Sequence, residues 1–460
     1  MDLSALNALS PVDGRYAASA APLRPFFSES ALICERIRVE ALWLDALTQQ
    51  RLGLLAAPLP AAARERLTQL ARDPGPDAPA AVKATERRIN HDVKAVEYFV
   101  RDAMAAAGAN PAALELVHFG CTSEDINNLS YARLLQRARE EVLLPELDRI
   151  GAALRTLAHD YAALPMLART HGQTASPTTF GKEVANVGAR LQRARLRLAG
   201  VEVLAKWNGA VGNYNAHLIA RPEIDWLNVS CQFIQSQSLV WNPYSTQIEP
   251  HDWIAELCDA CASINVILID WCRDVWGYIS LGYLKQRAVA GEVGSSTMPH
   301  KVNPIDFENA EGNFGLANAM LRFFADKLPI SRWQRDLTDS TVLRNLGVAL
   351  AHSFIGWKAL QRGLSRITPD PRRMSDDLGG AYETLAEAIQ SVLRLAGVPG
   401  GYETLKDFTR GQRIDSAALQ SFVASLPLNT ADRERLANLT PLEYTGLAAV
   451  LARQFASTAE

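Results

Sequence analysis

Residues 251–285 read HDWIAELCDACASINVILIDWCRDVWGYISLGYLK, and this stretch decides the fold class of the chain. Its apolar residues recur every three or four positions, which is the period of a helix with an apolar face. A helix of about 30 residues is roughly 45 Å long, so the stretch predicts an elongated helical bundle. The recurring positions are Trp253, Ile254, Leu257, Cys261, Ile264, Ile267, Leu268, Trp271, Val275, Trp276 and Ile279.

Long spans without proline carry the helical pattern through the middle of the chain. Proline inside a helix removes a hydrogen bond and clashes with the preceding turn, so its absence favours long helices. Trp271, Trp276 and Leu268 are spread around the helix, and a helix that is apolar on several sides needs neighbours on several sides. We therefore expect the bundle to pack against copies of itself. The proline-free spans are residues 178–221, 251–298, 305–328 and 330–368.

The helical pattern predicts an all-α protein with three helical domains. Residues 1–111 form an N-terminal helical domain that begins with an irregular, turn-rich arm around residues 10–16. Residues 112–365 form the central domain of long helices, and they include a loop at 291–304 with two glycines and two prolines. Residues 366–460 are interrupted more often by proline, which predicts a small domain of shorter helices.

Composition and charge exclude several classes of protein. The 460 residues include 47 Lys and Arg against 50 Asp and Glu, so there is no basic excess for nucleic acid or for a membrane surface. No uninterrupted apolar stretch is long enough to span a membrane. The first residues lack the features of a signal peptide, so a cytoplasmic location is expected.

The cysteines favour neither a metal site nor a redox site. Cys258 and Cys261 form a CxxC pair, but they lie in a strongly apolar helical run without a second CxxC or paired histidines. We expect the cysteines to be reduced and buried. They are Cys34, Cys121, Cys231, Cys258, Cys261 and Cys272.

Three polar segments interrupt the central domain, at residues 118–128, 169–177 and 291–304. Each has an ordinary explanation: a helix cap at Thr122 or Ser123, an unremarkable loop histidine at His171, and a solvated serine-rich turn. The first and third segments also suit an anion. A helix N-terminus with hydroxyls can seat a carboxylate, and the amides and hydroxyls of 294–297 can surround an anion, with a positive charge added by Lys301.

In this order and spacing, the three segments resemble the signature regions of the fumarase/aspartase superfamily. The segment 169–173, together with His300, resembles the adenylosuccinate lyase branch of that superfamily. Further motifs of this branch occur at 90–92, 247–252 and 331–340, and the resemblance covers essentially the whole chain. It implies elimination of fumarate from adenylosuccinate and from succinylaminoimidazole carboxamide ribotide (SAICAR), which gives AMP and AICAR in purine biosynthesis. It also implies a homotetramer with active sites shared between subunits, and no metal or organic cofactor.

The resemblance assigns roles to individual residues. Ser295 is implied as the general base and His171 as the general acid that protonates the leaving nitrogen. Serine is a poor base unless its alkoxide is stabilised, and Ser296 is an adjacent alternative that chemistry alone does not exclude. The implied substrate-binding residues are Arg15, Tyr16, Asn90, His91, Asp92, Thr122, Ser123, Gln247, Ser296, Lys301, Asn303, Asn309, Arg335, Ser340, Thr341 and Arg344.

Two other functions compete with this prediction. The first is a lyase of the same superfamily that acts on argininosuccinate, aspartate or malate, which Gly172 and His300 disfavour. The second is a non-catalytic structural protein on the same scaffold. Loss of His171, Ser295 or Lys301 would mark such a protein, and all three residues are present.

Overall fold

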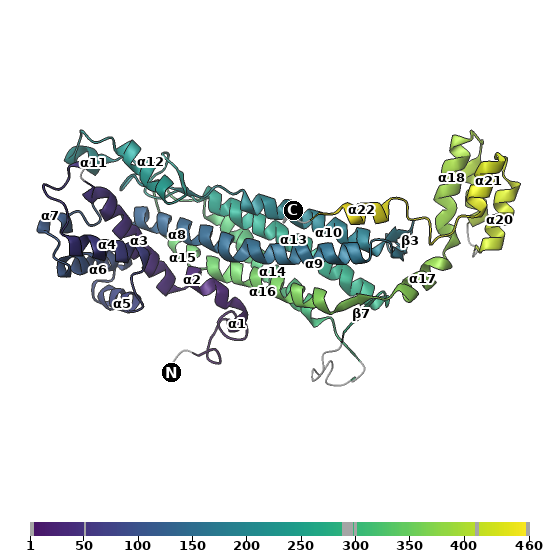
Figure 1. Cartoon of the computed structure of the whole chain (residues 1–460), viewed down its shortest axis with the longest axis horizontal. Helices are drawn as coiled ribbons and strands as arrows, with labels where there is room; N and C mark the ends of the chain where they lie inside the picture. Colours follow the sequence, from purple (N-terminus) through teal and green to yellow (C-terminus); the bar gives the residue numbers. More distant parts are fainter. Residues whose placement is uncertain (1–3, 50–51, 288–297, 299–300, 410–413, 457–460) are drawn as a thin grey trace. The chain divides into compact units, whose positions relative to one another are not determined.

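The computed structural model describes residues 4–49, 52–287, 298, 301–409 and 414–456, and it is predominantly helical (Figure 1). The prediction of an all-α fold is confirmed. The strands of the described chain are short, and they pair as β1 with β4, β2 with β3, β5 with β6, and β7 with β8. All of these pairs are antiparallel except β5 with β6.

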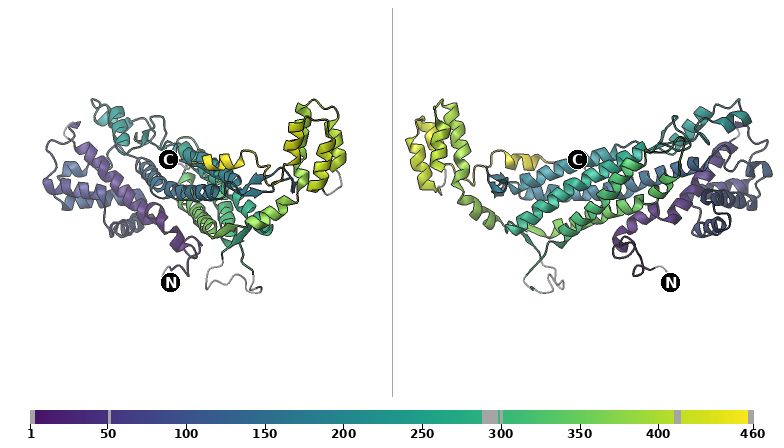
Figure 2. Two further views of the ribbon diagram at one scale, coloured as in Figure 1. Left: turned by 45° about the vertical axis from the view of Figure 1, so that its right-hand side comes forward. Right: turned by 180° about the vertical axis from the view of Figure 1, so that it is seen from behind.

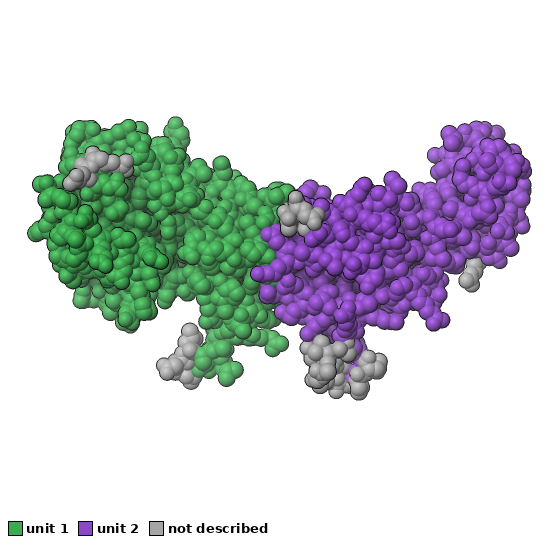
Figure 3. Space-filling model, in the orientation of Figure 1, with its two compact units in different colours: residues 1–146, 195–265, 313–355 green, residues 147–194, 266–312, 356–460 purple. Residues whose placement is uncertain are grey.

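The chain divides into two compact units, which Figure 3 colours separately. Unit 1 comprises residues 1–146, 195–265 and 313–355, and unit 2 comprises residues 147–194, 266–312 and 356–460. The division into domains 1–111, 112–365 and 366–460 stays a prediction. The boundaries between the units fall within long helices, so each of these helices contains residues of both units. They are α9 (Leu144–Asp160), α10 (Phe180–Ala199), α13 (Asp252–Ser280), α14 (Ile305–Lys327) and α16 (Leu346–Arg366).

The stretch with the strongest helical pattern forms α13, as predicted. Leu257, Ile264, Leu268 and Trp271 on it are buried, whereas Trp276 is 53% exposed. The apolar period therefore marks the buried face correctly, and Trp276 extends the apolar surface beyond it. After α13, β7 (Leu284–Gln286) pairs with β8 (Ile367–Pro369).

Polar and apolar contacts join the long helices within each unit. In unit 1, the buried side-chain amide of Asn265 on α13 donates to Asn318 Oδ1 on α14, at 3.0 Å, and to Ser353 Oγ on α16, at 2.8 Å. In unit 2, the ring of Phe307 on α14 packs against Gly363 on α16. A Cβ atom at Gly363 would lie 2.8 Å from this ring, so the close approach requires glycine.

The N-terminal helices of unit 1 gather around α3 (Glu29–Thr48), which begins where Ser28 Oγ accepts the Ala31 N–H at 3.1 Å. This helix packs against α4 (Ala61–Arg72), α5 (Ala78–Ile89), α6 (Asp92–Ala106) and α8 (Ser123–Ala138). Figure 2 shows these helices from two further directions. After α8, a π-helical turn at Arg139–Leu143 leads into α9.

Short elements connect the longer helices. In the first half of the chain they are α1 (Ala17–Ala20), a 3₁₀ turn (Ala21–Leu23), α2 (Arg24–Phe27), α7 (Pro111–Leu114), β1 (Pro165–Met166), β2 (Arg169–Thr170), β3 (Gln173–Thr174), β4 (Thr178–Thr179) and β5 (Leu204–Ala205). They continue with α11 (Asn215–Ala220), α12 (Trp226–Ser236), β6 (Val240–Trp241), α15 (Thr338–Leu343), α17 (Pro371–Gly379), a 3₁₀ turn (Tyr382–Leu385) and α22 (Ala448–Gln454).

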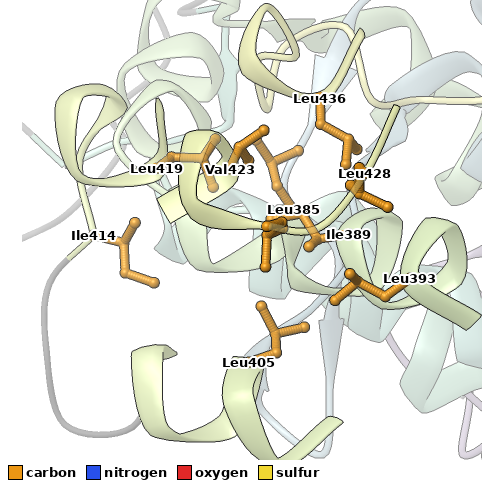
Figure 4. Close-up of a cluster of buried hydrophobic side chains, with 10 residues drawn as sticks. Leu385, Ile389, Leu393, Leu405, Ile414, Leu419, Val423, Leu428 and Leu436 are labelled. Atoms are coloured by element: carbon orange, nitrogen blue, oxygen red, sulfur yellow. The ribbon is translucent and has the colours of Figure 1, made fainter. Parts of the chain in front are cut away.

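The C-terminal helices of unit 2 enclose a small apolar cluster of their own. They are α18 (Ala386–Leu395), α19 (Gly401–Thr409), α20 (Ser416–Ser425) and α21 (Thr430–Ala437). Leu385, Ile389, Leu419, Val423 and Leu436 point toward one another in Figure 4, and all are buried. Short helices around a small core agree with the change in pattern that the sequence shows after residue 366.

A fully buried ion pair fixes the start of α8 in unit 1. Lys206 Nζ lies 3.0 Å from Asp125 Oδ1, and neither side chain is exposed. Lys206 also donates to the Gly209 carbonyl, while Asp125 accepts the N–H groups of Thr122 at 2.8 Å and of Asn208 at 3.0 Å. The pair thus ties the N-terminus of α8 to the chain that follows β5.

Replacement of one partner of this pair is expected to destabilise the protein strongly. Lys206→Met leaves the Asp125 carboxylate buried without its cation, which costs about 3–5 kcal/mol. The double variant with Asp125→Asn is expected to recover part of that loss. The midpoint of urea unfolding measures both effects. The control is Lys83→Met, which breaks a 2.7 Å pair with Glu86 whose lysine is 40% exposed, at a cost of about 0–1 kcal/mol. Equal losses for the two lysines would contradict this account.

Candidate active site

The predicted site residues belong to two groups, one in each unit. Unit 1 holds the N-terminal turn, the starts of α6 and α8, Gln247 and the residues of and around α15. Unit 2 holds His171, Lys301, Asn303 and Asn309. Ser295, Ser296 and His300 lie outside the described residues.

Thr122 and Ser123 form the N-terminus of α8. Thr122 is the N-cap residue, and its N–H donates to the Asp125 side chain at 2.8 Å, so the interpretation of this segment as a helix cap is confirmed. Both residues are half-buried. A helix N-terminus carries a partial positive charge that favours a negatively charged group, so the cap also remains suited to a carboxylate.

The segment 90–92 joins α5 to α6 through an unusual cap. Asn90 adopts a left-handed conformation with φ 54° at the end of α5. The N-cap of α6 is His91, whose Nδ1 accepts the Lys94 N–H at 3.1 Å. An accepting Nδ1 places the ring proton of the neutral imidazole on Nε2, so the exposed His91 side chain can offer a donor.

Asp92 lies between two arginines from other parts of unit 1. Its Oδ2 is 3.0 Å from Arg36 Nη2 and 3.2 Å from Arg344 Nη2. Burial opposes ionisation of Asp92, but Arg36, the Val93 N–H and Arg344 outweigh it and hold the pKa of the carboxyl below its ordinary value. Asp92 is therefore an anion that orients two cations.

Gln247 and Arg335 meet at the edge of an open cleft. Arg335 Nη1 donates to Gln247 Oε1 at 3.3 Å, and Arg335 Nη2 lies 3.0 Å from Glu124 Oε1. The cleft has a volume of about 780 Å³ and is lined by these two residues, Val211 and residues 331–334 and 336. This volume suits a small-molecule ligand.

The short helix α15 carries Ser340 and Thr341 and ends at Arg344. The buried Asp339 accepts the Ser340 N–H at 2.7 Å and lies 3.4 Å from His251 Nε2. Burial raises the pKa of Asp339, but the contacts with His251 and Arg335 bring it below the ordinary value. Ser340 is half-buried, whereas Thr341 and Arg344 are exposed.

A chain of polar side chains links these residues within unit 1. Glu124 Oε1 accepts Asn127 Nδ2 at 2.7 Å, and Asn127 Oδ1 accepts Arg36 Nε at 2.9 Å. Arg36 then pairs with Asp92. Sequence reasoning did not assign Arg36, Glu124 or Asn127 to the site. Glu124 and Asn127 lie in a segment it singled out, but Arg36 gives no local signal in the middle of α3.

The N-terminal turn places Arg15 and Tyr16 at the surface of unit 1. The Tyr16 N–H donates to the Pro11 carbonyl at 2.9 Å, and the Gly14 N–H donates to the Ser10 carbonyl at 2.9 Å. Arg15 is exposed and Tyr16 is half-buried. The turn is therefore held by its own backbone hydrogen bonds.

In unit 2, His171 occupies the tip of a tight hairpin. The strands β2 and β3 pair directly through Thr170 and Gln173, so the loop between them is only His171 and Gly172. Both have positive φ, 54° and 73°, as a type I′ turn requires. Glycine adopts this conformation without strain, and the turn leaves the His171 side chain exposed to solvent.

Lys301, Asn303 and Asn309 lie at the start of α14. Lys301 is exposed, and its N–H donates to the Met298 carbonyl at 3.0 Å. Asn303 precedes the helix and Asn309 lies within its first turns, and both are half-buried. Gln286 of β7 donates to the Val302 carbonyl at 2.7 Å, and this hydrogen bond connects the segment to strand β7.

The described residues offer no group of three or more His, Cys, Asp and Glu side chains that could hold a metal. Cys258 and Cys261 are buried in α13, and burial raises the pKa of the Cys261 thiol to about 12. Cys34, Cys121 and Cys231 are only half-buried, so the expectation of burial holds for part of the set. Within the described ranges, no helix is apolar over enough length to cross a membrane.

Comparison with known proteins identifies relatives over the whole chain. A lyase family model matches residues 14–320, and the model of the adenylosuccinate lyase C-terminal region matches residues 331–445. Adenylosuccinate lyase of Vibrio cholerae is 51% identical over 97% of this chain and 98% of its own. Adenylosuccinate lyase of Escherichia coli K12 is 50% identical over the same shares.

A solved structure shows the same fold at much lower identity. A fumarate lyase from Mesorhizobium sp. BNC1 superposes with a TM-score of 0.73 at 18% identity, covering 94% of this chain and 96% of its own. The lyase model alone spans more than half of the chain, and curated relatives share about half of their residues with it over nearly their full length. The chain is therefore a lyase and belongs to the adenylosuccinate lyase family.

Proposed function

We propose that this protein eliminates fumarate from adenylosuccinate, giving AMP, and from SAICAR, giving AICAR, in purine biosynthesis. In this reaction a base removes a proton from the carbon next to one carboxylate, the carbon–nitrogen bond breaks, and an acid protonates the departing nitrogen. The observation that carries the proposal is a sequence identity of 50–51% to curated adenylosuccinate lyases over nearly their full length.

The charges of unit 1 suit such a substrate, which carries a phosphate and two carboxylates. Arg335 borders the open cleft beside Gln247, and Arg344 lies exposed at the end of α15. Each guanidinium already has acidic neighbours that fix its direction, and an arriving anion meets oriented donors. We assign Arg15, Tyr16, the segment 90–92, Thr122, Ser123, Ser340 and Thr341 to the same binding function.

We assign the acid to His171 and the base to Ser295. An imidazole can accept and donate a proton at its ring nitrogens, and the exposed imidazole of His171 stands on a rigid two-residue turn. Ser295 requires stabilisation of its alkoxide, for which the loop amides and Lys301 supply donors and positive charge. Lys301 and Asn303 stabilise the carboxylate that gains charge as the proton leaves, and Asn309 and Ser296 are assigned to substrate binding.

We further propose a cytoplasmic homotetramer whose active sites combine residues of different subunits. Support comes from large apolar side chains that the single chain leaves exposed on its long helices. They are Val266 (42%) and Trp276 (53%) on α13, and Leu316 (58%) and Phe323 (54%) on α14. Large apolar side chains that stay exposed on long helices are suited to burial against further copies.

His171→Ala is expected to lower kcat by about 10²- to 10⁴-fold, because the leaving nitrogen loses its proton donor. Ultraviolet absorbance reports the release of fumarate from adenylosuccinate, and size-exclusion chromatography shows whether the oligomer persists. Near-normal turnover in a correctly assembled variant would reject the role of His171. A wild-type protein that releases no fumarate would reject the proposed function.

Ser295→Ala is expected to lower kcat by at least about 10³-fold, whereas Ser296→Ala is expected to raise KM with a smaller effect on kcat. The two serines are adjacent and chemically identical, so each variant is the matched control for the other. Steady-state kinetics on both substrates provide the measurement. The opposite order of effects would move the base to Ser296.

Mixing the two inactive variants, His171→Ala and Ser295→Ala, tests whether sites are shared. If the residues of one site come from different subunits, random reassembly restores both in about a quarter of the sites. Activity is measured after mild dissociation and reassociation of the mixture. No recovery, although subunits demonstrably exchange, would show that one chain supplies both residues.

A further inference from the structure

We infer that Glu124 is a positioning residue for the proposed reaction: it orients Arg335 toward an anionic group of the substrate. The inference rests on the proposed function and adds to it a residue that has no assigned role. It is carried by the contacts and burial of Glu124 within unit 1.

Glu124 is a buried carboxylate at a rigid point. It is the second residue of α8 and is 3% exposed. Its Oε1 accepts Arg335 Nη2 at 3.0 Å and Asn127 Nδ2 at 2.7 Å, whereas Oε2 is buried and finds no donor among the described residues. A buried carboxylate requires compensation, and the Arg335 guanidinium supplies it.

Arg335 depends on this contact because its own segment provides little packing. Around it, Trp333 is 93% exposed and Leu337 is 69% exposed. The side chain of Arg335 is nevertheless only 15% exposed, since it reaches Glu124 and Gln247. Its distance to Asp339 is 3.9 Å, so Glu124 is the nearer carboxylate. The orientation of the guanidinium is therefore set mainly from α8.

The contact also couples Arg335 to Arg344. Through Asn127 and Arg36, Glu124 is connected to Asp92, which pairs with Arg344 at 3.2 Å. Glu124 is thus the residue that links Arg335 to the polar contacts that begin at Asp92. A change at this point disturbs Arg335 without removing a group that we expect to touch the substrate.

Glu124→Gln is the informative substitution, because it keeps the shape and removes the charge. A neutral amide binds guanidinium more weakly than a carboxylate does, so Arg335 loses order. Uniform loss of substrate binding raises KM without lowering kcat, and we expect a rise in KM of about tenfold with kcat changed by less than about twofold.

The matched control is Glu141→Gln on the helical run that continues α8. Glu141 Oε1 pairs with Arg137 Nε at 2.8 Å, so the chemistry of the contact is the same. Glu141 is 51% exposed and lies outside the proposed site. Its substitution is expected to leave both KM and kcat unchanged.

The decisive experiment is a double-mutant cycle with Arg335→Gln. If Glu124 acts through Arg335, Glu124→Gln adds less than about twofold to KM once Arg335 is replaced. Fully additive effects would overturn the inference, because they would mean that Glu124 meets the substrate itself. An unchanged KM in Glu124→Gln alone would overturn it as well.

Asn127→Ala provides a second route if Glu124→Gln fails to fold. It removes one donor to Glu124 and leaves the pair with Arg335, so a smaller rise in KM of about two- to threefold is expected, again absent in the Arg335→Gln background. If the wild type is active but Asn127→Ala leaves KM unchanged, the inference is refuted and the proposed function stands. An inactive wild type refutes the proposed function, and the inference falls with it.

Discussion

The ion pair between Asp125 and Lys206 fixes the start of α8, where the predicted binding residues Thr122 and Ser123 of unit 1 lie. Both charges are fully buried, and the carboxylate also accepts backbone N–H groups from each side of the contact. Asn128 reinforces it, since its side chain exchanges hydrogen bonds with the backbone of Lys206 at 2.9 and 3.2 Å. These bonds hold the N-terminus of α8, and with it Thr122, Ser123 and Glu124, in one orientation.

Around this fixed point, unit 1 arranges its cations before any substrate arrives. Arg335 faces Glu124, and Arg344 lies within 3.2 Å of both Glu29 and Asp92. Each pair lowers the freedom of a long side chain, and each leaves guanidinium donors for an anion. The acids also offset the repulsion between cations, so a binding surface for a polyanion can exist in the free protein.

In unit 2, the backbone at His171 is likewise restricted to one conformation. Its hairpin has a loop of two residues, and the positive φ of both is supported by the paired strands rather than by contacts of the imidazole. The side chain is consequently exposed on a backbone that has few alternatives. A rigid support combined with free access suits the proposed role of His171 as a proton donor.

Local pattern was sufficient for part of this protein. The three-and-four period of 251–285 predicted α13, and the polar segments marked the start of α8 and the turn at His171. Each of these features depends on interactions within one or two helical turns or within a hairpin, so neighbouring residues determine them.

Tertiary structure decided the rest. Arg36 and Glu124 meet Asp92 and Arg335 across many intervening residues, and such pairings depend on how helices pack, which no local pattern encodes.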